Sequence, residues 1–140
     1  MGHAADRRND PTAFVVSADA AVRDSVRALV ESADLQAETF PSLQAFLDVE
    51  PGRTGCLVFD ANVSDLSDPE RQTTLAAVCS RMPGIFLTDR GDVPMAVRAL
   101  KLGAVDVVQK PYRDENLLGG IQRALESSLA DHNEPVLPTT

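Results

Sequence analysis

The sequence predicts an α/β fold in which five parallel strands form one doubly wound sheet with helices on both faces, a (βα)5 arrangement. Three observations predict it. Short apolar runs alternate with segments that repeat apolar residues at helical spacing. The runs at 14–16 and 57–59 are continuously apolar, which is typical of parallel strands covered on both faces. The 140 residues, 44% of them hydrophobic, suffice for one well-buried core.

The individual elements follow from these patterns. Strands are expected at 13–17, 37–40, 55–60, 84–88 and 105–109, and all but the second are expected to be buried on both faces. Helices are expected at 20–33, 42–49, 69–80, 94–102 and 114–129, with N-caps at Ser42, Asp68 and Asp114. Right-handed crossovers between successive strands then give the doubly wound sheet.

We expect a single folded domain over residues 12–130, between disordered tails at 1–11 and 131–140. A second folded unit is not expected, and no output module is recognisable after the last helix. His3 and His132 fall in the two tails, so a catalytic or metal role is not expected for either histidine.

Composition excludes several classes of function. The net charge is −8 and the basic residues are scattered among acids, which argues against a nucleic-acid surface. No apolar run is long enough to span a membrane or to act as a signal peptide, so the expected location is the cytoplasm. Cys56 and Cys79 lack metal-ligand spacing and are interpreted as small buried hydrophobes rather than as a regulatory disulfide.

Polar residues follow the predicted strands at the edge where such sheets carry their functional crevice. A carboxylate, a hydroxyl and an ammonium group that meet there suit a phosphoryl group, because the carboxylate can accept it while the other two hold its oxygens. The residues at these strand ends are Ser17, Ala18, Asp19, Asp60, Thr88, Lys110 and Pro111.

The most specific stretch is FLTDRGDVPMAVRALKLGAVD, at residues 86–106, which is followed by Gln109-Lys110-Pro111-Tyr112. Together with the segments 21–25 and 55–60, it resembles the receiver domains of response regulators, most closely those of the nitrogen-fixation and nitrate-response type, over residues 13–127. The resemblance implies a flavodoxin-like receiver fold and a cis peptide between Lys110 and Pro111. It also implies that Asp60 is the phosphoacceptor, Thr88 the hydroxyl that reports phosphorylation and Lys110 the lysine that pairs with the phosphate.

The chain departs from that family at its metal site. Receivers carry two or three acids directly after the first strand, which hold Mg²⁺ together with the phosphoacceptor, whereas this chain has Ser17, Ala18 and Asp19. Asp19 is better interpreted as a helix cap than as a ligand, and the Asn62 carbonyl is poor compensation. We therefore expect weak Mg²⁺ binding and no other cofactor. The switch position, usually aromatic, is Val107, so that switch is expected to be absent.

These features predict an atypical stand-alone receiver that acts by protein–protein interaction, with weak or no Mg²⁺-dependent phosphorylation. In this interpretation Asp60 is a strand-end acid paired with Lys110, and the partner is a histidine kinase or another response regulator. The alternative is a phosphorylatable single-domain regulator that uses Asp60. A flavodoxin-like cofactor enzyme is disfavoured, because the loop at 17–20 has no phosphate-cradling glycines. We do not expect an enzyme.

A partner surface is expected on the fourth helix, the fifth strand and the fifth helix. Receivers commonly use this surface to form homodimers or to hold a partner. Its charged rim is expected to consist of Met95, Arg98, Lys101, Asp106, Arg113 and Arg123. An apolar centre, which an interface normally needs, is not identifiable from the sequence.

Overall fold

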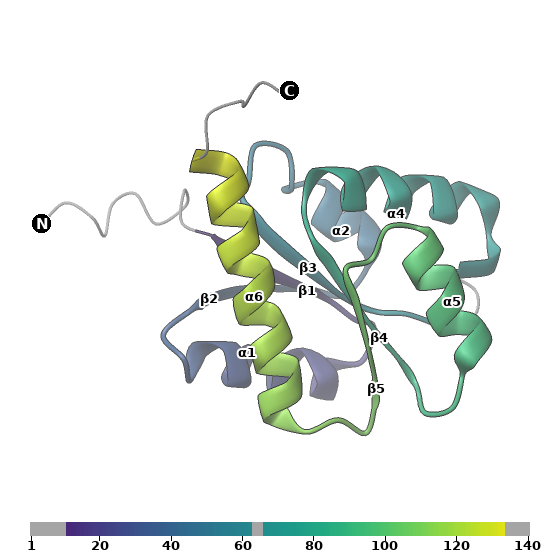
Figure 1. The fold of residues 1–140 in the computed structure, drawn as a ribbon, viewed down its shortest axis with the longest axis horizontal. Helices are drawn as coiled ribbons and strands as arrows, with labels where there is room; N and C mark the ends of the chain where they lie inside the picture. The colour runs from purple at the N-terminus through teal and green to yellow at the C-terminus, as the bar shows by residue number, and fades with distance from the viewer. Residues whose placement is uncertain (1–10, 63–65, 134–140) are drawn as a thin grey trace, which may run out of the picture.

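The computed structural model describes residues 11–62 and 66–133 and contains one five-stranded sheet in the order β2-β1-β3-β4-β5 (Figure 1). Every neighbouring pair of strands is parallel. The predicted (βα)5 sheet is therefore confirmed. The strands are β1 (Thr12–Val16), β2 (Gln36–Phe40), β3 (Gly55–Asp60), β4 (Gly84–Asp89) and β5 (Asp106–Lys110).

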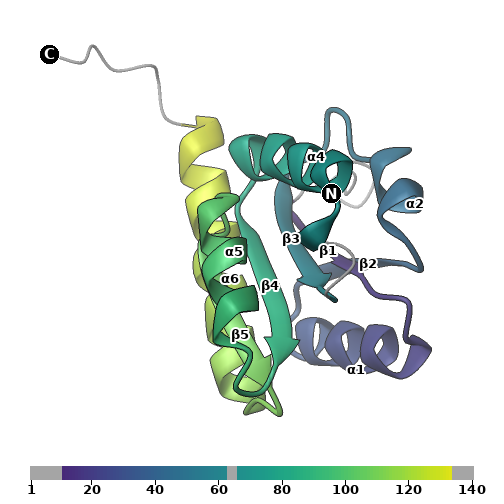
Figure 2. The same cartoon turned by 90° about the vertical axis from the view of Figure 1, so that its right-hand side faces the viewer.

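Helices cover both faces of the sheet, as Figures 1 and 2 show. On one face lie α1 and α6, and on the other lie α2, α4 and α5. The helices are α1 (Ala20–Glu31), α2 (Leu43–Leu47), α4 (Pro69–Arg81), α5 (Val93–Lys101) and α6 (Asp114–Asn133). None of the described helices is both long enough and apolar enough to cross a membrane.

Alternation along the central strands divides the core into two clusters. In β1, Phe14 belongs to the cluster under α2, α4 and α5, while Val15 belongs to the cluster under α1 and α6. Both side chains are almost completely buried, which explains why the run is continuously apolar. Burying a side chain of this size contributes about 1.5–3 kcal/mol, so these central strands form a rigid base for the loops at their ends.

Aspartate and serine side chains begin most of the helices. Ser42 and Asp68 accept hydrogen bonds from the N–H groups of Ala45 and Glu70, which confirms both predicted caps. Asp92 caps α5 in the same way. The cap prediction for Asp114 is wrong, because this residue is the first of α6 and lies inside the helix.

Two further expectations need correction. β5 is only half-buried, not covered on both faces, because it lies at the edge of the sheet and has a neighbour on one side only. The helix α6 continues to Asn133, so residues 131–133 of the predicted C-terminal tail are helical. The next helix-breaking residue is Pro135, which explains why the sequence permits this extension. The tail predictions for residues 1–10 and 134–140 lie outside the described residues.

Candidate functional site

A cleft of about 440 Å³ opens at the carboxyl end of the sheet. Its walls come from the loop after β1, the start of α2, the end of β3 and the ends of β4 and β5. This is the edge at which open parallel sheets hold their ligands, because the loops that follow neighbouring strands diverge there. The expected convergence is observed for Ser17, Asp60 and Lys110, all of which line the cleft.

Asp60 is held from two sides. The ammonium nitrogen Nζ of Lys110 lies 2.6 Å from Asp60 Oδ1, and the hydroxyl of Ser17 donates a 2.7 Å hydrogen bond to Oδ2. The Asp60 side chain is 13% exposed and that of Lys110 is 32% exposed, so water screens the pair only in part. The predicted ion pair between Lys110 and Asp60 is present, and the chain's own side chains occupy both carboxylate oxygens.

The Ser17 hydroxyl that reaches Asp60 is itself fixed in place. Ser17 is 2% exposed, and its Oγ also accepts a 3.0 Å hydrogen bond from the backbone N–H of Asp19. Arg23 Nη1 donates to the Ser17 carbonyl oxygen at 2.7 Å, which ties the loop to α1. The loop therefore presents a neutral hydroxyl to Asp60 from a well-supported position.

The side chains at the expected metal positions do not fit Mg²⁺, which requires a near-octahedral shell of oxygen ligands built around carboxylates. Asp19 is exposed, and its Oδ1 accepts a 2.9 Å hydrogen bond from Ala21 N, so it caps α1 as predicted. Ala18 has no ligand atom, and Asn62 is exposed. Across residues 11–62 and 66–133, no three His, Cys, Asp or Glu side chains gather in a way that could hold a metal ion.

Thr88 and Val107 lie behind the cleft rather than in it. Thr88 is fully buried, and its Oγ1 has no hydrogen-bond partner among the described residues, so it contacts neither end of the Asp60 pair. Val107 is half-buried against the core cluster under α5. The peptide bond between Lys110 and Pro111 is cis, as the resemblance implies.

The predicted rim on α5, β5 and α6 is exposed at Arg98, Lys101, Arg113 and Arg123, and half-buried at Asp106. Met95 was wrongly assigned to this rim. It is 4% exposed and packs into the core, because it lies on the face of α5 that is turned towards the sheet.

The sequence pattern places Val97 and Leu100 on one stripe of α5 but does not show that this stripe is exposed, and Val93 extends it. Val93, Val97 and Leu100 are 60%, 43% and 52% exposed. Their i, i+4, i+7 spacing puts them on one helix face, and their exposure shows that this face points outwards.

Three charged residues near the cleft were missed in the sequence interpretation. Arg23 fixes the loop after β1, while Arg71 and Asp89 line the cleft. Arg71 Nε lies 3.8 Å from Asp68 Oδ2. Asp89 was identifiable in principle, since it directly follows Thr88 at the end of a predicted strand.

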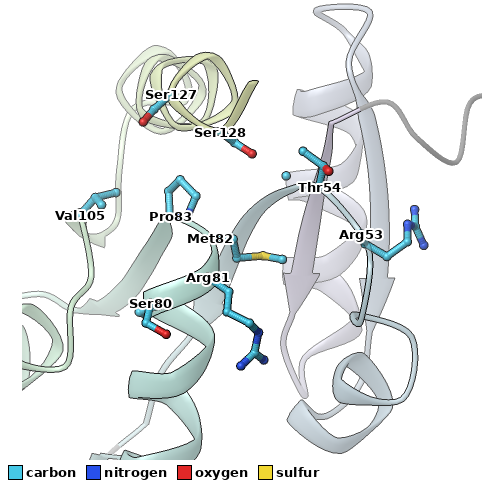
Figure 3. A pocket seen from close by; sticks show the side chains of 11 residues that line it. Arg53, Thr54, Ser80, Arg81, Met82, Pro83, Val105, Ser127 and Ser128 are labelled. Carbon is cyan, nitrogen blue, oxygen red and sulfur yellow. The ribbon is translucent and has the colours of Figure 1, made fainter. Parts of the chain in front are cut away.

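A second groove, of about 430 Å³, lies near the other end of the sheet, between the end of α4 and α6 (Figure 3). It contains hydroxyl groups, but its two arginines are paired with acids: Arg81 with Glu50, and Arg53 with Glu38. In Figure 3 both guanidinium groups extend away from Ser127 and Ser128. The groove therefore offers no unpaired cation from the described side chains.

The two cysteines are unreactive by environment. Cys79 lines the second groove, and burial raises the pKa of its thiol to about 11. Cys56 is fully buried, and burial raises its pKa to about 12. Both are free thiols, which agrees with their interpretation as small hydrophobes.

Comparison with known proteins gives the same family that the sequence resembles. The model of the protein family described as "Response regulator receiver domain" matches residues 13–122 of this chain. The chain is 41% identical over 114 residues to the response regulator protein TmoT of Ectopseudomonas mendocina, covering 81% of this chain and 52% of TmoT. It is 40% identical over 116 residues to the transcriptional regulatory protein FixJ of Bradyrhizobium diazoefficiens, covering 82% and 57%. The chain thus spans about half the length of these curated relatives.

Solved structures agree with these relatives. The crystal structure of FixJ-N superposes with a TM-score of 0.73 at 32% identity, covering 94% of this chain and 99% of that one. The response regulator StyR superposes with a TM-score of 0.75 at 38% identity, covering 88% and 63%. The chain therefore belongs to the response regulator receiver family of two-component signalling.

Proposed function

We propose that this receiver acts mainly by binding a protein partner and that Asp60 accepts a phosphoryl group poorly in the presence of Mg²⁺. One observation carries the proposal: Ser17 and Lys110 hold both oxygens of the Asp60 carboxylate. The protein is proposed to have no enzymatic activity other than this slow transfer, and to work in the cytoplasm with its partner.

The physical argument concerns charge. Phosphoryl transfer is accelerated mostly by positive groups that neutralise the transferring oxygens, and a divalent cation is usually the strongest of them. At the positions where the family carries acids, this chain offers Ser17 and Ala18, which supply no negative charge to attract a cation. Among the described residues Lys110 is the ion-pair partner of Asp60, and one monovalent charge cannot replace a divalent ion at the transition state.

Labelling of the protein with a small phosphodonor tests the proposal. Wild type and Asp60→Asn are incubated with a small acyl phosphate and millimolar Mg²⁺, and intact mass is followed over time. We expect wild type to gain a phosphoryl group hardly faster than Asp60→Asn. Rapid Mg²⁺-dependent labelling that is lost in Asp60→Asn would establish the alternative, a phosphorylatable regulator.

The proposed partner is a histidine kinase, another response regulator or a second copy of the chain. The proposed contact surface is the outer face of α5 with β5 and the start of α6. Val93, Val97 and Leu100 supply an exposed apolar centre, and basic residues surround it. Apolar centres with polar rims are typical of protein interfaces. The rim residues are Arg98, Lys101, Arg113 and Arg123, with Asp106 partly covered.

Charge reversal tests this surface. Arg98→Glu or Lys101→Glu should weaken association in sedimentation and in pull-down with candidate kinases, because each puts an acid beside the apolar centre. Arg27→Glu is the control, since Arg27 is also exposed but lies on α1, over the other face of the sheet. Association that survives both rim changes would remove this surface from the proposal.

A further inference from the structure

The cleft contains a second carboxylate beside the Asp60 pair. Asp89 is the last residue of β4, is exposed, and lines the same cleft as Asp60 and Lys110. In the register between β4 and β5, Asp89 is paired with Lys110, so the two residues are direct neighbours across the strands. One ammonium group therefore has two acids within its surroundings.

The alternation of the strands places all three side chains on one side of the sheet. Val58, Leu87 and Val108 lie two residues before Asp60, Asp89 and Lys110, and all three contact the cluster under α1 and α6. Residues two apart on a strand point to the same face. Lys110 pairs with Asp60, and none of the ion pairs among the described residues includes Asp89.

The charges around the cleft do not cancel. Its lining includes three carboxylates, of Asp19, Asp60 and Asp89, against two cationic side chains, of Lys110 and Arg71. Arg71 also lies close to Asp68, outside the lining, which weakens its effect in the cleft. Counted over the described residues and with Asp60 included, the lining of the cleft therefore carries a net charge of −1.

We infer that Asp89 is a specificity-determining residue of this cleft, and that its carboxylate repels phosphate and other small anions that approach Asp60. This inference rests on the proposed function, in which Asp60 is a poor phosphoryl acceptor. It adds a second reason for poor phosphoryl transfer to Asp60, one that does not depend on the residues at the metal positions. A phosphate dianion that binds roughly 5–10 Å from one negative charge in water-like surroundings should bind roughly fivefold more weakly than it would without that charge. The effect must shrink at high ionic strength, because salt screens exposed charges.

Asp89→Asn tests the inference, since the amide keeps the size of the side chain and removes its charge. Glu126→Gln is the matched control, because Glu126 is an exposed acid on α6 that lines a different groove. Inorganic phosphate is titrated into each protein without Mg²⁺ at low salt, while the backbone amide shifts of Ser17 and Asp60 are followed. Asp89→Asn should bind phosphate roughly fivefold more tightly than wild type, and Glu126→Gln should differ less than twofold.

Equal phosphate affinities in Asp89→Asn and wild type, or no binding by either, would overturn the inference. A labelling arm separates it from the proposed function. If wild type is labelled rapidly with Mg²⁺, the proposed function fails, but a further rise in Asp89→Asn would still support the role of Asp89. If wild type is labelled slowly and Asp89→Asn no faster, the proposed function stands and Asp89 has no such role.

Discussion

The two ends of the sheet each hold an acid and a base brought together from distant segments, but the two pairs are built differently. Near the amino end, Arg81 at the end of α4 contacts both oxygens of Glu50, the shortest contact being 2.7 Å, and the Glu50 side chain is 7% exposed. At the carboxyl end, the nearest contact of Lys110 is with Oδ1 of Asp60, and the Ser17 hydroxyl donates to Oδ2.

This difference separates a structural clamp from a functional site. A guanidinium group that holds both oxygens of a buried carboxylate fixes the geometry of the pair. A lysine and a hydroxyl that share a carboxylate at the wall of an open cleft can each be released separately. An ion pair alone thus does not identify a site, and the Asp60 pair is our candidate because it lies at convergent strand ends in a receiver fold.

The largest expected effect concerns the carboxyl end. The double substitution Ser17→Asp with Ala18→Asp restores the acids that receivers carry there, so Mg²⁺-dependent labelling by a small acyl phosphate should rise by about 100-fold or more. Intact mass gives the rate, and adding Asp60→Asn should abolish the gain. No gain in the double variant would show that something other than the missing acids limits transfer.

At the amino end, the thiol of Cys79 should be nearly inert although it lines a groove. Because burial raises the pKa of Cys79 to about 11 from an ordinary value of 9.0, its thiolate fraction at pH 8 is lower by about 100-fold than that of an ordinary thiol. Alkylation followed by mass should be slow at pH 8 and accelerate as pH rises towards 11. Fast alkylation of Cys79 at pH 8 would mean that the structure around the groove opens readily and exposes the thiol to water.

Removing Arg81 should destabilise the fold more than removing one member of an exposed ion pair. Arg81→Ala leaves the Glu50 carboxylate buried without its main partner, which should lower the free energy of unfolding by about 2 kcal/mol in urea denaturation. Arg27→Ala is the control, because the pair of Arg27 with Glu31 is half-exposed on both sides and contributes at most about 0.5 kcal/mol. Equal losses in both variants would contradict the clamp.

Removing Lys110 should reduce the stability of the fold less than removing Arg81 does. In Lys110→Met, Asp60 keeps the Ser17 hydrogen bond and borders an open cleft, so water can solvate it and the loss should stay below about 1 kcal/mol. The same urea measurement tests this expectation. A loss larger than that of Arg81→Ala would mean that the two pairs are alike and that the comparison fails.

Much of this arrangement is predictable from the sequence, because strand periodicity and the position of polar residues after each strand depend on local patterns. The sheet, the meeting of Asp60 with Lys110, and the caps at Asp19 and Ser42 belong to this class. The sheet and the meeting of Asp60 with Lys110 need only the alternation of elements and the rule that parallel strands end at one edge. The caps need only a polar side chain directly before a helix.

Other features depend on how elements dock, which a local pattern does not contain. Whether Met95 or Val97 faces the core is set by the rotation of α5 on the sheet, so the stripe was visible but its direction was not. The half-burial of β5 follows from strand order. The bond from Ser17 to Asp60 needs the side-chain orientation of a loop that Arg23 holds in place.

Titration with Mg²⁺ tests whether Ser17 and Lys110 satisfy Asp60 in place of a divalent cation. Backbone amide shifts of Ser17, Asp60 and Lys110 are followed as Mg²⁺ is added through the millimolar range, in wild type and in the Ser17→Asp, Ala18→Asp variant. We expect no saturable change in wild type and a saturable change in the variant. Saturation of all three amides at low millimolar Mg²⁺ in wild type would contradict the claim.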